Sequence, residues 1–225
     1  AIKAGATDFI PKPWEKEKLL ATLSSGMKLR RSRTEINLLK EQVEVLSNAT
    51  AGGSEEVIIG DSLVMQQVFS TVEKLRDTDA NILILGENGT GKDVIARLLY
   101  RNSPRYGKPF VTIDLGSIPE QLFESELFGY EKGAFTDARK AKAGRMEVAT
   151  SGTLFLDEIG NLSLPMQAKL LTAIEKRCIS RLGSTQATPI DVRLICATNA
   201  DIRRLVDEGD FRQDLLYRIN TIELH

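Results

Sequence analysis

From about residue 56 onward, short apolar runs alternate with amphipathic segments along the chain. The apolar runs are rich in β-branched residues, which is typical of buried strands; they cover 81–85, 110–113, 153–156 and 192–198. Between them, residues 94–99 and 170–174 repeat apolar side chains at helical spacing. Strands that alternate with helices predict a parallel sheet covered on both faces, which is an α/β domain.

The segment before this domain, residues 27–46, has a different period. Leu29, Ile36 and Val43 repeat every seven residues. Leu39 and Leu46 occupy the fourth position of the same heptad, and charged residues fill most of the other positions. Such a stripe can join two helices in a coiled coil, so we expect a dimerising helix. A single amphipathic helix that packs on its own domain is the alternative, because fewer than three full heptads are present.

The first residues carry turn and strand signals. An extended run at Asp8–Ile10 is followed by Lys12 and Pro13, and a helical pattern begins at about Glu15. Proline ends the run because it has no N–H to donate and restricts the residue before it. Residues 48–54 form a second break, which we interpret as a flexible linker. These breaks predict three segments, namely residues 1–26, 27–53 and 54–225.

Composition is that of an ordinary globular protein, with 42% apolar and 27% charged residues. The 30 basic and 31 acidic residues nearly cancel, so overall charge favours neither nucleic acid nor an anionic membrane. The apolar runs are too short to span a bilayer, and no signal peptide opens the sequence. Cys178 and Cys196 lack metal-ligand spacing, which favours a reduced, cytoplasmic setting. Because the chain does not begin with Met, we expect an internal fragment of a longer protein.

The segment Gly86–Asp93, GENGTGKD, follows the strand pattern 81–85 and precedes a helical one. Gly-x-x-x-x-Gly-Lys in this context predicts a phosphate-binding loop, in which backbone N–H groups turn inward and Lys92 reaches the β- and γ-phosphate oxygens. The expected nucleotide-binding residues are Gly86, Glu87, Asn88, Gly89, Thr90, Gly91, Lys92, Asp93 and Val94. Asp93 replaces the usual Ser or Thr that holds Mg²⁺, and a carboxylate can also hold this ion. The alternative is a plain glycine turn.

Two adjacent acids, Asp157 and Glu158, end the apolar run 153–156. Asp157 at the strand tip is placed to bind the Mg²⁺ of a nucleoside triphosphate, and Glu158 can orient and deprotonate the attacking water. Adjacent carboxylates at the end of a buried strand are costly unless a metal ion or hydrogen-bond donors compensate them. A helix-capping role is the alternative.

The sequence ELFGYEKGAFTDA, residues 126–138, makes the chain resemble a known family. With the two motifs above, it resembles the central AAA+ domain of bacterial enhancer-binding proteins that activate sigma-54 RNA polymerase, from roughly residue 58 to the end. In that family the hexapeptide GAFTGA tips a loop that pushes sigma-54. Asp137 replaces the usual glycine, which removes backbone freedom and adds a charge, and the matching positions are Gly133, Ala134, Phe135, Thr136 and Ala138. Outside this motif, Phe135 would be expected to pack in a core.

The resemblance implies further site residues. Asn199 corresponds to the family's first sensor, a polar group that reads the γ-phosphate. Arg212 and Arg218 correspond to arginine fingers that reach a neighbour's nucleotide. Ile59 and Gly60 correspond to further nucleotide contacts. As isolated residues, Asn199 would be a turn cap and the two arginines would be surface ion-pair partners.

Two other positions are interpreted through resemblance. The first 26 residues resemble the end of a bacterial response-regulator receiver domain, which is flavodoxin-like, and Lys12 takes the place of the lysine that faces the phosphorylated aspartate. A solvent-facing lysine is the alternative. Asp114 stands where the AAA+ family generally has an asparagine that restrains the catalytic glutamate. An ionised aspartate accepts hydrogen bonds and cannot donate them, so this switch would work differently here.

Taken together, the chain resembles a sigma-54-dependent response regulator of the NtrC type. The implied fold is an AAA+ P-loop NTPase three-layer sandwich with a truncated helical lid, after a helical linker and the receiver end. The implied activity is ATP hydrolysis with Mg²⁺ in a hexameric ring that remodels the sigma-54 RNA polymerase promoter complex. Further implied partners are a second copy through the linker, a histidine kinase, and DNA through a domain outside this sequence. Asp93, Asp114 and Asp137 keep open an ATP-responsive DNA-binding regulator that assembles but does not activate sigma-54.

Overall fold

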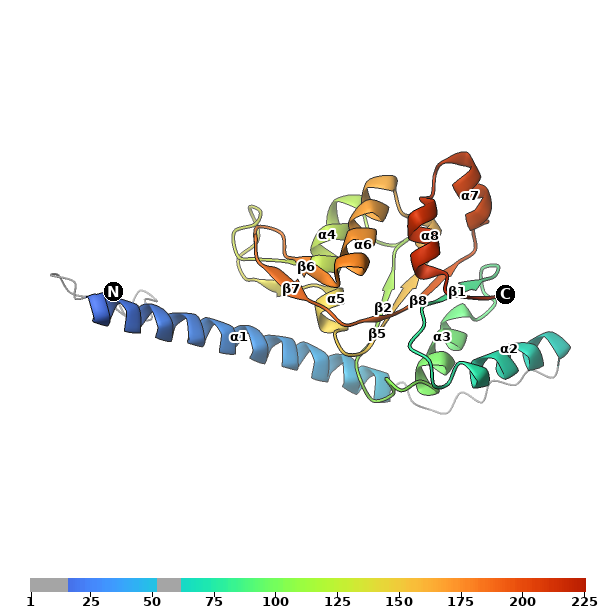
Figure 1. Cartoon of the computed structure of the whole chain (residues 1–225), viewed down its shortest axis with the longest axis horizontal. Coiled ribbons are helices and arrows are strands. Elements are labelled where there is room, and N and C mark those ends of the chain that lie inside the picture. Colours follow the sequence, from blue (N-terminus) through green and yellow to red (C-terminus); the bar gives the residue numbers. More distant parts are fainter. Residues whose placement is uncertain (1–15, 52–61) are drawn as a thin grey trace. The chain divides into compact units, whose positions relative to one another are not determined.

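The computed structural model describes residues 16–51 and 62–225 (Figure 1). The chain divides into two units, Ala1–Val43 and Glu44–His225. Helix α1 (Lys16–Ala51) is continuous, so the predicted boundary between residues 26 and 27 falls inside one helix. The flexible linker predicted from Asn48 is wrong for its first four residues, which are helical. The physical reason is that no Gly or Pro interrupts the chain before Gly52 at this end of the helix.

The described residues contain a central sheet of five parallel strands in the order β2-β5-β8-β1-β9. The strands are β1 (Ile82–Leu85), β2 (Phe110–Asp114), β5 (Thr153–Asp157), β8 (Arg193–Thr198) and β9 (Ile222–Leu224). The first four confirm the strands predicted from the apolar runs. The fifth was not predicted, and it pairs with β1 in parallel at the edge of the sheet.

Helices cover both faces of this sheet, as predicted. Figure 1 shows α2 and α3 on one side, and α4, α6 and α8 on the other. These helices are α2 (Leu63–Lys74), α3 (Lys92–Arg101), α4 (Glu120–Phe128), α6 (Leu164–Lys176) and α8 (Gln213–Ile219). Ile82, Ile84 and Ile195 pack with Val72 of α2 and Leu99 of α3 in one buried cluster. Alternation along the strands sends the intervening side chains to the opposite face.

The remaining elements are short and lie around the sheet. They are β3 (Gly129–Tyr130), β4 (Lys142–Ala143), α5 (Arg145–Val148), the 3-10 helix η2 (Ile159–Asn161), β6 (Cys178–Ser180), β7 (Ala187–Pro189) and α7 (Ile202–Glu208). Pairs β3/β4 and β6/β7 form two antiparallel ribbons. In the described part of the chain, no helix is long and apolar enough to cross a membrane.

Candidate functional site

The phosphate-binding loop connects β1 to α3, as the sequence predicts. Gly89 and Gly91 have φ angles of 80° and 85°, which glycine adopts without strain. Lys92 is the first residue of α3 and is 8% exposed. Its Nζ donates to the carbonyl oxygens of Gly86 and Glu87, both at 3.0 Å. The loop therefore closes around a buried ammonium at the N-terminus of a helix, which is the arrangement that binds phosphate.

Glu158 and Asn199 lie beside this loop. The Glu158 carboxylate is 3.8 Å from Lys92 Nζ, and it accepts a hydrogen bond from the Asn199 backbone N–H at 3.3 Å. The Asn199 side chain donates to Asn88 Oδ1 in the loop at 2.9 Å. Glu158 itself has φ 54° and ψ 47°, a left-handed conformation that costs free energy in a non-glycine residue. Three of the predicted catalytic residues thus converge, although they come from three different strand ends.

Asp157 ends β5 next to Glu158, and its Oδ1 accepts the Glu158 backbone N–H at 3.0 Å. Burial raises the pKa of the Asp157 carboxyl above its ordinary value, and the negative charges of Glu158 and Asp114 raise it further. The hydrogen bond from the Glu158 N–H and the positive charge of Lys92 lower this pKa, but their effect is smaller than the increase. Asp114 is its partner in register on β2. A cation would relieve the crowding of these carboxylates, so the residues present fit a magnesium ion.

No group of three or more His, Cys, Asp or Glu side chains in the described residues could hold a metal ion by itself. This fits magnesium, which is usually held by one or two carboxylates together with waters and phosphate oxygens. Asp157 is the residue that would hold it. Asp93 lies exposed in the first turn of α3.

Asp114 has a local role in the structure. Its Oδ1 accepts the Gly116 backbone N–H at 2.9 Å, and its carbonyl accepts the Ser117 hydroxyl at 2.9 Å. Glu158, by contrast, is held by Lys92 and Asn199. The side chain of Asp114 therefore closes its own turn, and the contacts of Glu158 in this structure come from other residues.

The hexapeptide Gly133–Ala138 forms the tip of a tight loop between β3 and β4. The Gly133 N–H donates to the Ala138 carbonyl, and the Ala138 N–H donates to the Phe135 carbonyl. Phe135 is 44% exposed, with its ring edge against Tyr130 at a centroid distance of 4.9 Å. Ala138 is buried, so of the six predicted contact residues it is the one whose side chain this conformation does not present.

Asp137 at the loop tip is exposed. Its φ is not positive, unlike that of Gly133, which is 85°. Replacing the family's glycine with aspartate therefore introduces no left-handed strain at this position. What the substitution adds is a negative charge beside the exposed Phe135 ring.

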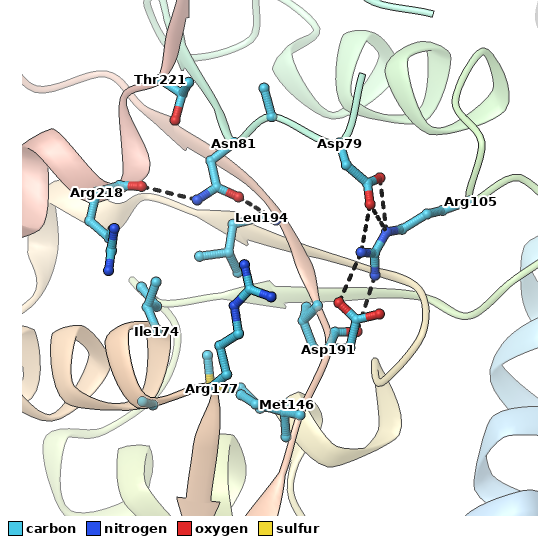
Figure 2. A pocket seen from close by; sticks show the side chains of 14 residues that line it. Asp79, Asn81, Arg105, Met146, Ile174, Arg177, Asp191, Leu194, Arg218 and Thr221 are labelled. Carbon is cyan, nitrogen blue, oxygen red and sulfur yellow. Dashed lines mark hydrogen bonds and ion pairs between the residues drawn. The ribbon is translucent and has the colours of Figure 1, made fainter. Parts of the chain in front are cut away.

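Arg212 and Arg218 lie at the two ends of α8, and among the described residues no hydrogen bond or ion pair joins either side chain to the phosphate-binding loop. Arg212 is exposed and pairs with Asp214, at 2.7 Å between Nη2 and Oδ2. Arg218 lines a pocket beside Asn81, at the amino end of β1, whereas the phosphate-binding loop follows the carboxyl end (Figure 2). Because β1 has four residues, roughly 13 Å of strand separates these two ends. The structure does not bring the arginines to the catalytic cluster of the same chain.

Two side-chain amides that sequence reasoning missed hold the ends of α8. Gln167 of α6 is fully buried; its Oε1 accepts the Arg212 N–H at 2.8 Å, and its Nε2 donates to the carbonyls of Leu162 and Asp210. Asn81 donates to the Arg218 carbonyl at 3.0 Å and accepts from Leu194 N–H. The only sign of this role in the sequence was that Gln167, a polar residue, occupies a position of α6 where the helical pattern predicts an apolar side chain. These amides are positioning residues for the two arginines.

Three predicted residues lie outside the described residues, namely Lys12, Ile59 and Gly60. Both cysteines are free thiols. Cys196 is fully buried in β8, and burial raises the pKa of its thiol to about 12. A buried thiol with a raised pKa is unreactive, which gives Cys196 a packing role.

Comparison with known proteins identifies the family. Residues 58–225 match the model of the Sigma-54 interaction domain. The chain is 43% identical to the C4-dicarboxylate transport transcriptional regulatory protein DctD of Pseudomonas aeruginosa and 40% identical to the DNA-binding transcriptional regulator NtrC of Escherichia coli K12. Both alignments cover all of this chain, and they cover 47% and 46% of those proteins. The chain thus spans about half the length of the curated relatives it matches.

A solved structure of NtrX from Brucella abortus in complex with ATP is also similar. It is 30% identical in sequence with a TM-score of 0.69, over 99% of this chain and 48% of that chain. The fold, with a phosphate-binding loop on a parallel sheet, is that of an AAA+ P-loop NTPase and agrees with the nucleotide site described above. The chain therefore belongs to the Sigma-54 interaction domain family.

Proposed function

We propose that this chain is the ATP-hydrolysing part of a transcription activator that acts on sigma-54 RNA polymerase. The observation that carries the proposal is the convergence of Lys92, Glu158 and Asn199 beside the phosphate-binding loop. A cation, an acid and an amide at the end of a parallel sheet are the groups needed to bind a triphosphate, activate water and read the γ-phosphate. Family membership supports ATP as the substrate.

In the proposed reaction, water attacks the γ-phosphate and ADP leaves. Glu158 orients this water and accepts its proton, and the Lys92 ammonium stabilises negative charge on the phosphoryl oxygens in the transition state. Asn199 is tied to both Glu158 and the loop, so it can report on the γ-phosphate. Magnesium, when bound at Asp157, would neutralise charge on the β- and γ-phosphates.

Arg212 and Arg218 act on a neighbouring copy in this proposal. Arg218 lies at the opposite end of β1 from the phosphate-binding loop of its own chain, and a head-to-tail contact would bring both arginines to the next site. Repetition of that contact closes a ring, which we propose to contain six copies. The exposed Phe135 at the tip of the Gly133–Ala138 loop would contact sigma-54 as ATP is consumed.

The first segments serve regulation in this proposal. Residues 1–26 are the end of a receiver domain that a histidine kinase phosphorylates, and residues 27–53 join two copies. The heptad repeat of Leu29, Ile36, Leu39 and Val43 along the continuous helix α1 supports a partner helix. DNA would be bound by a domain outside this sequence, in the cytoplasm. The relatives, named as transcriptional regulators, support this reading.

The decisive experiment measures open-complex formation at a sigma-54 promoter with purified full-length protein. We expect open complexes with ATP and none with a non-hydrolysable analogue. The Phe135→Ala variant should hydrolyse ATP but form no open complexes, whereas Tyr106→Ala, which removes another exposed aromatic ring, should behave as wild type. If the wild-type protein hydrolyses ATP and assembles without ever opening the promoter, it is instead an ATP-responsive DNA-binding regulator.

A further inference from the structure

A pocket of about 510 Å³ lies at the amino ends of β1 and β8, beside Asn81 and Val192. Its apolar lining comes from α5, α6, β8 and the segment before β8, and includes Met146, Ala173, Ile174, Ile190 and Leu194. Figure 2 shows the side chains of Arg177 and Arg218 extending into it, Arg177 from the end of α6 and Arg218 from α8. Two separate elements thus present guanidinium groups to one concave surface.

Of the three arginines that line this pocket, only Arg105 forms ion pairs among the described residues. A third arginine, Arg105, is neutralised by Asp79 at 2.7 Å and Asp191 at 3.0 Å, and burial and these contacts fix its position on one wall (Figure 2). Among the residues that the structure describes, neither Arg177 nor Arg218 forms an ion pair. Both side chains are exposed. The two carboxylates that line the pocket, Asp79 and Asp191, are thus paired with Arg105, and in the described part of the chain they leave Arg177 and Arg218 as two guanidinium groups without an ion pair.

The backbone at Arg177 is also unusual. Arg177 follows the last turn of α6 with φ 47° and ψ 37°, a left-handed conformation that glycine or asparagine adopts at lower cost. Its carbonyl accepts the Ile190 N–H, which fixes this conformation beside the pocket. The chain thus places an arginine at a backbone position where glycine or asparagine would cost less conformational free energy. Such strain in a non-glycine residue is a feature of functional sites.

We propose that Arg177 acts in trans together with Arg218, and that both guanidinium groups receive the phosphoryl oxygens of a nucleotide bound to the neighbouring copy. This inference rests on the proposed function, which brings an anion to Arg218 from the next protomer. Guanidinium groups recognise phosphate through paired N–H donors, and two of them can bind more than one oxygen. Arg177 is then an additional phosphate-binding residue that the sequence motifs do not reveal.

Arg177→Gly is the variant of choice because glycine adopts the left-handed conformation freely, so the fold is retained or stabilised. We expect the maximal ATP turnover of full-length protein at saturating protein concentration to fall about tenfold, a loss typical of one charged hydrogen-bonding group. The protein concentration that gives half-maximal turnover should be unchanged. Arg177→Lys should recover part of the rate because it restores the charge. Arg101→Ala removes an exposed arginine on α3 and should have no effect.

A mixing experiment tests whether Arg177 acts in trans. Arg177→Gly subunits keep their own catalytic cluster, and Glu158→Gln subunits keep both pocket arginines. Turnover per Arg177→Gly subunit should rise when Glu158→Gln subunits are added, because each mixed contact supplies the missing guanidinium. If turnover stays constant or falls, Arg177 does not act on a neighbour and the proposal is overturned.

Two other outcomes separate this inference from the proposed function. If wild-type turnover per subunit does not depend on protein concentration, the shared site and the proposed ring both fail. If wild-type turnover does depend on concentration but Arg177→Gly equals wild type, only the role of Arg177 fails. Arg177→Gly could instead reach the wild-type maximal turnover but require a higher protein concentration to do so. That result would show that Arg177 binds an acidic side chain of the neighbouring copy at the interface. It would therefore overturn the proposed contact between Arg177 and a phosphoryl group.

Discussion

The two ends of the central sheet differ in how complete their chemistry is. At the carboxyl ends of β1, β5 and β8, the chain supplies a cation, an acid and an amide that already contact one another: Lys92, Glu158 and Asn199. At the amino ends of β1 and β8, Arg177 and Arg218 enter a pocket whose two carboxylates, Asp79 and Asp191, are paired with Arg105 instead. In the proposed function, the carboxyl end binds the triphosphate, and the arginines of the amino end receive a phosphate from a neighbouring copy.

Under the proposed function, a single domain therefore carries two halves of two different active sites. The strand β1 separates Arg218 from the phosphate-binding loop of the same chain, because Arg218 lies at the amino end of the strand and the loop follows its carboxyl end. A second copy placed head to tail solves the problem, because its loop would face the arginines of the first. Substitutions at the carboxyl end of the sheet should therefore lower ATP turnover in the same subunit. Substitutions at the amino end should lower ATP turnover in the neighbouring subunit.

The largest effect is expected at the carboxyl end. Glu158→Gln keeps the size of the side chain and one oxygen that can accept the Asn199 N–H, but it has no charge to face Lys92 and cannot accept a proton. We expect ATP turnover to fall by about 10³-fold or more, in the range lost with a general base. ATP binding, measured by fluorescence of a labelled nucleotide, should be unchanged or tighter. Unimpaired hydrolysis in this variant would show that another group activates the water.

The next effect comes from the opposite end. Arg218→Ala should lower turnover by about 10³-fold, at the lower end of what an arginine that stabilises a transferring phosphoryl group contributes. Its own phosphate-binding loop is intact, so the Kd for ATP of the isolated subunit should equal that of wild type. Adding Glu158→Gln subunits should restore turnover to Arg218→Ala subunits. Failure to restore it, with normal assembly, would contradict the division into two halves.

A third effect concerns the amide that holds the start of α8. Gln167→Ala leaves the Arg212 N–H and the Leu162 and Asp210 carbonyls without a partner in a buried place. We expect a loss of about 2–3 kcal/mol of unfolding free energy, which corresponds to a decrease of roughly 5–10 °C in Tm for a domain of this size. Calorimetry measures this directly. Gln213→Ala removes an exposed glutamine nearby and should shift Tm by no more than about 1 °C.

The sequence predicts the carboxyl end of the sheet much better than the amino end. The phosphate-binding loop and the acid pair are local motifs in which spacing alone defines the geometry, and Lys92 and Glu158 lie where expected. The four strands were predictable because each is a continuous apolar run. Strand β9 was missed because Ile222 and Leu224 alternate with polar residues at a chain end, and its pairing with β1 depends on residues far away.

The pocket and its anchors could not be predicted for a similar reason. Asn81 and Arg218 are 137 positions apart in the sequence, and only the fold places them side by side. Arg177 follows a helix as one of several basic residues, and no motif marks its left-handed backbone. The sequence predicted the loop tip, but it could not show that the backbone freedom lost at Asp137 introduces no strain, because that depends on φ, which is not positive at this position. Sequence motifs record local geometry, whereas interfaces depend on distant contacts.

The smallest effect tests whether carboxylate crowding at the carboxyl end has a cost in stability. Burial raises the pKa of Asp157, so the folded state binds this proton more tightly than the unfolded state, and the ionised group destabilises the fold at neutral pH. Asp157→Asn should therefore raise Tm at pH 7 without nucleotide or magnesium, by roughly 1–2 °C. This difference should shrink as pH falls through the raised pKa toward the unfolded value of 3.8, because the wild-type carboxyl becomes neutral there too. Asp137→Asn, at the exposed loop tip, should show no such trend. A wild-type protein that is more stable than Asp157→Asn at pH 7 would mean that Asp157 already has a compensating partner, and the carboxyl end would not need a cation.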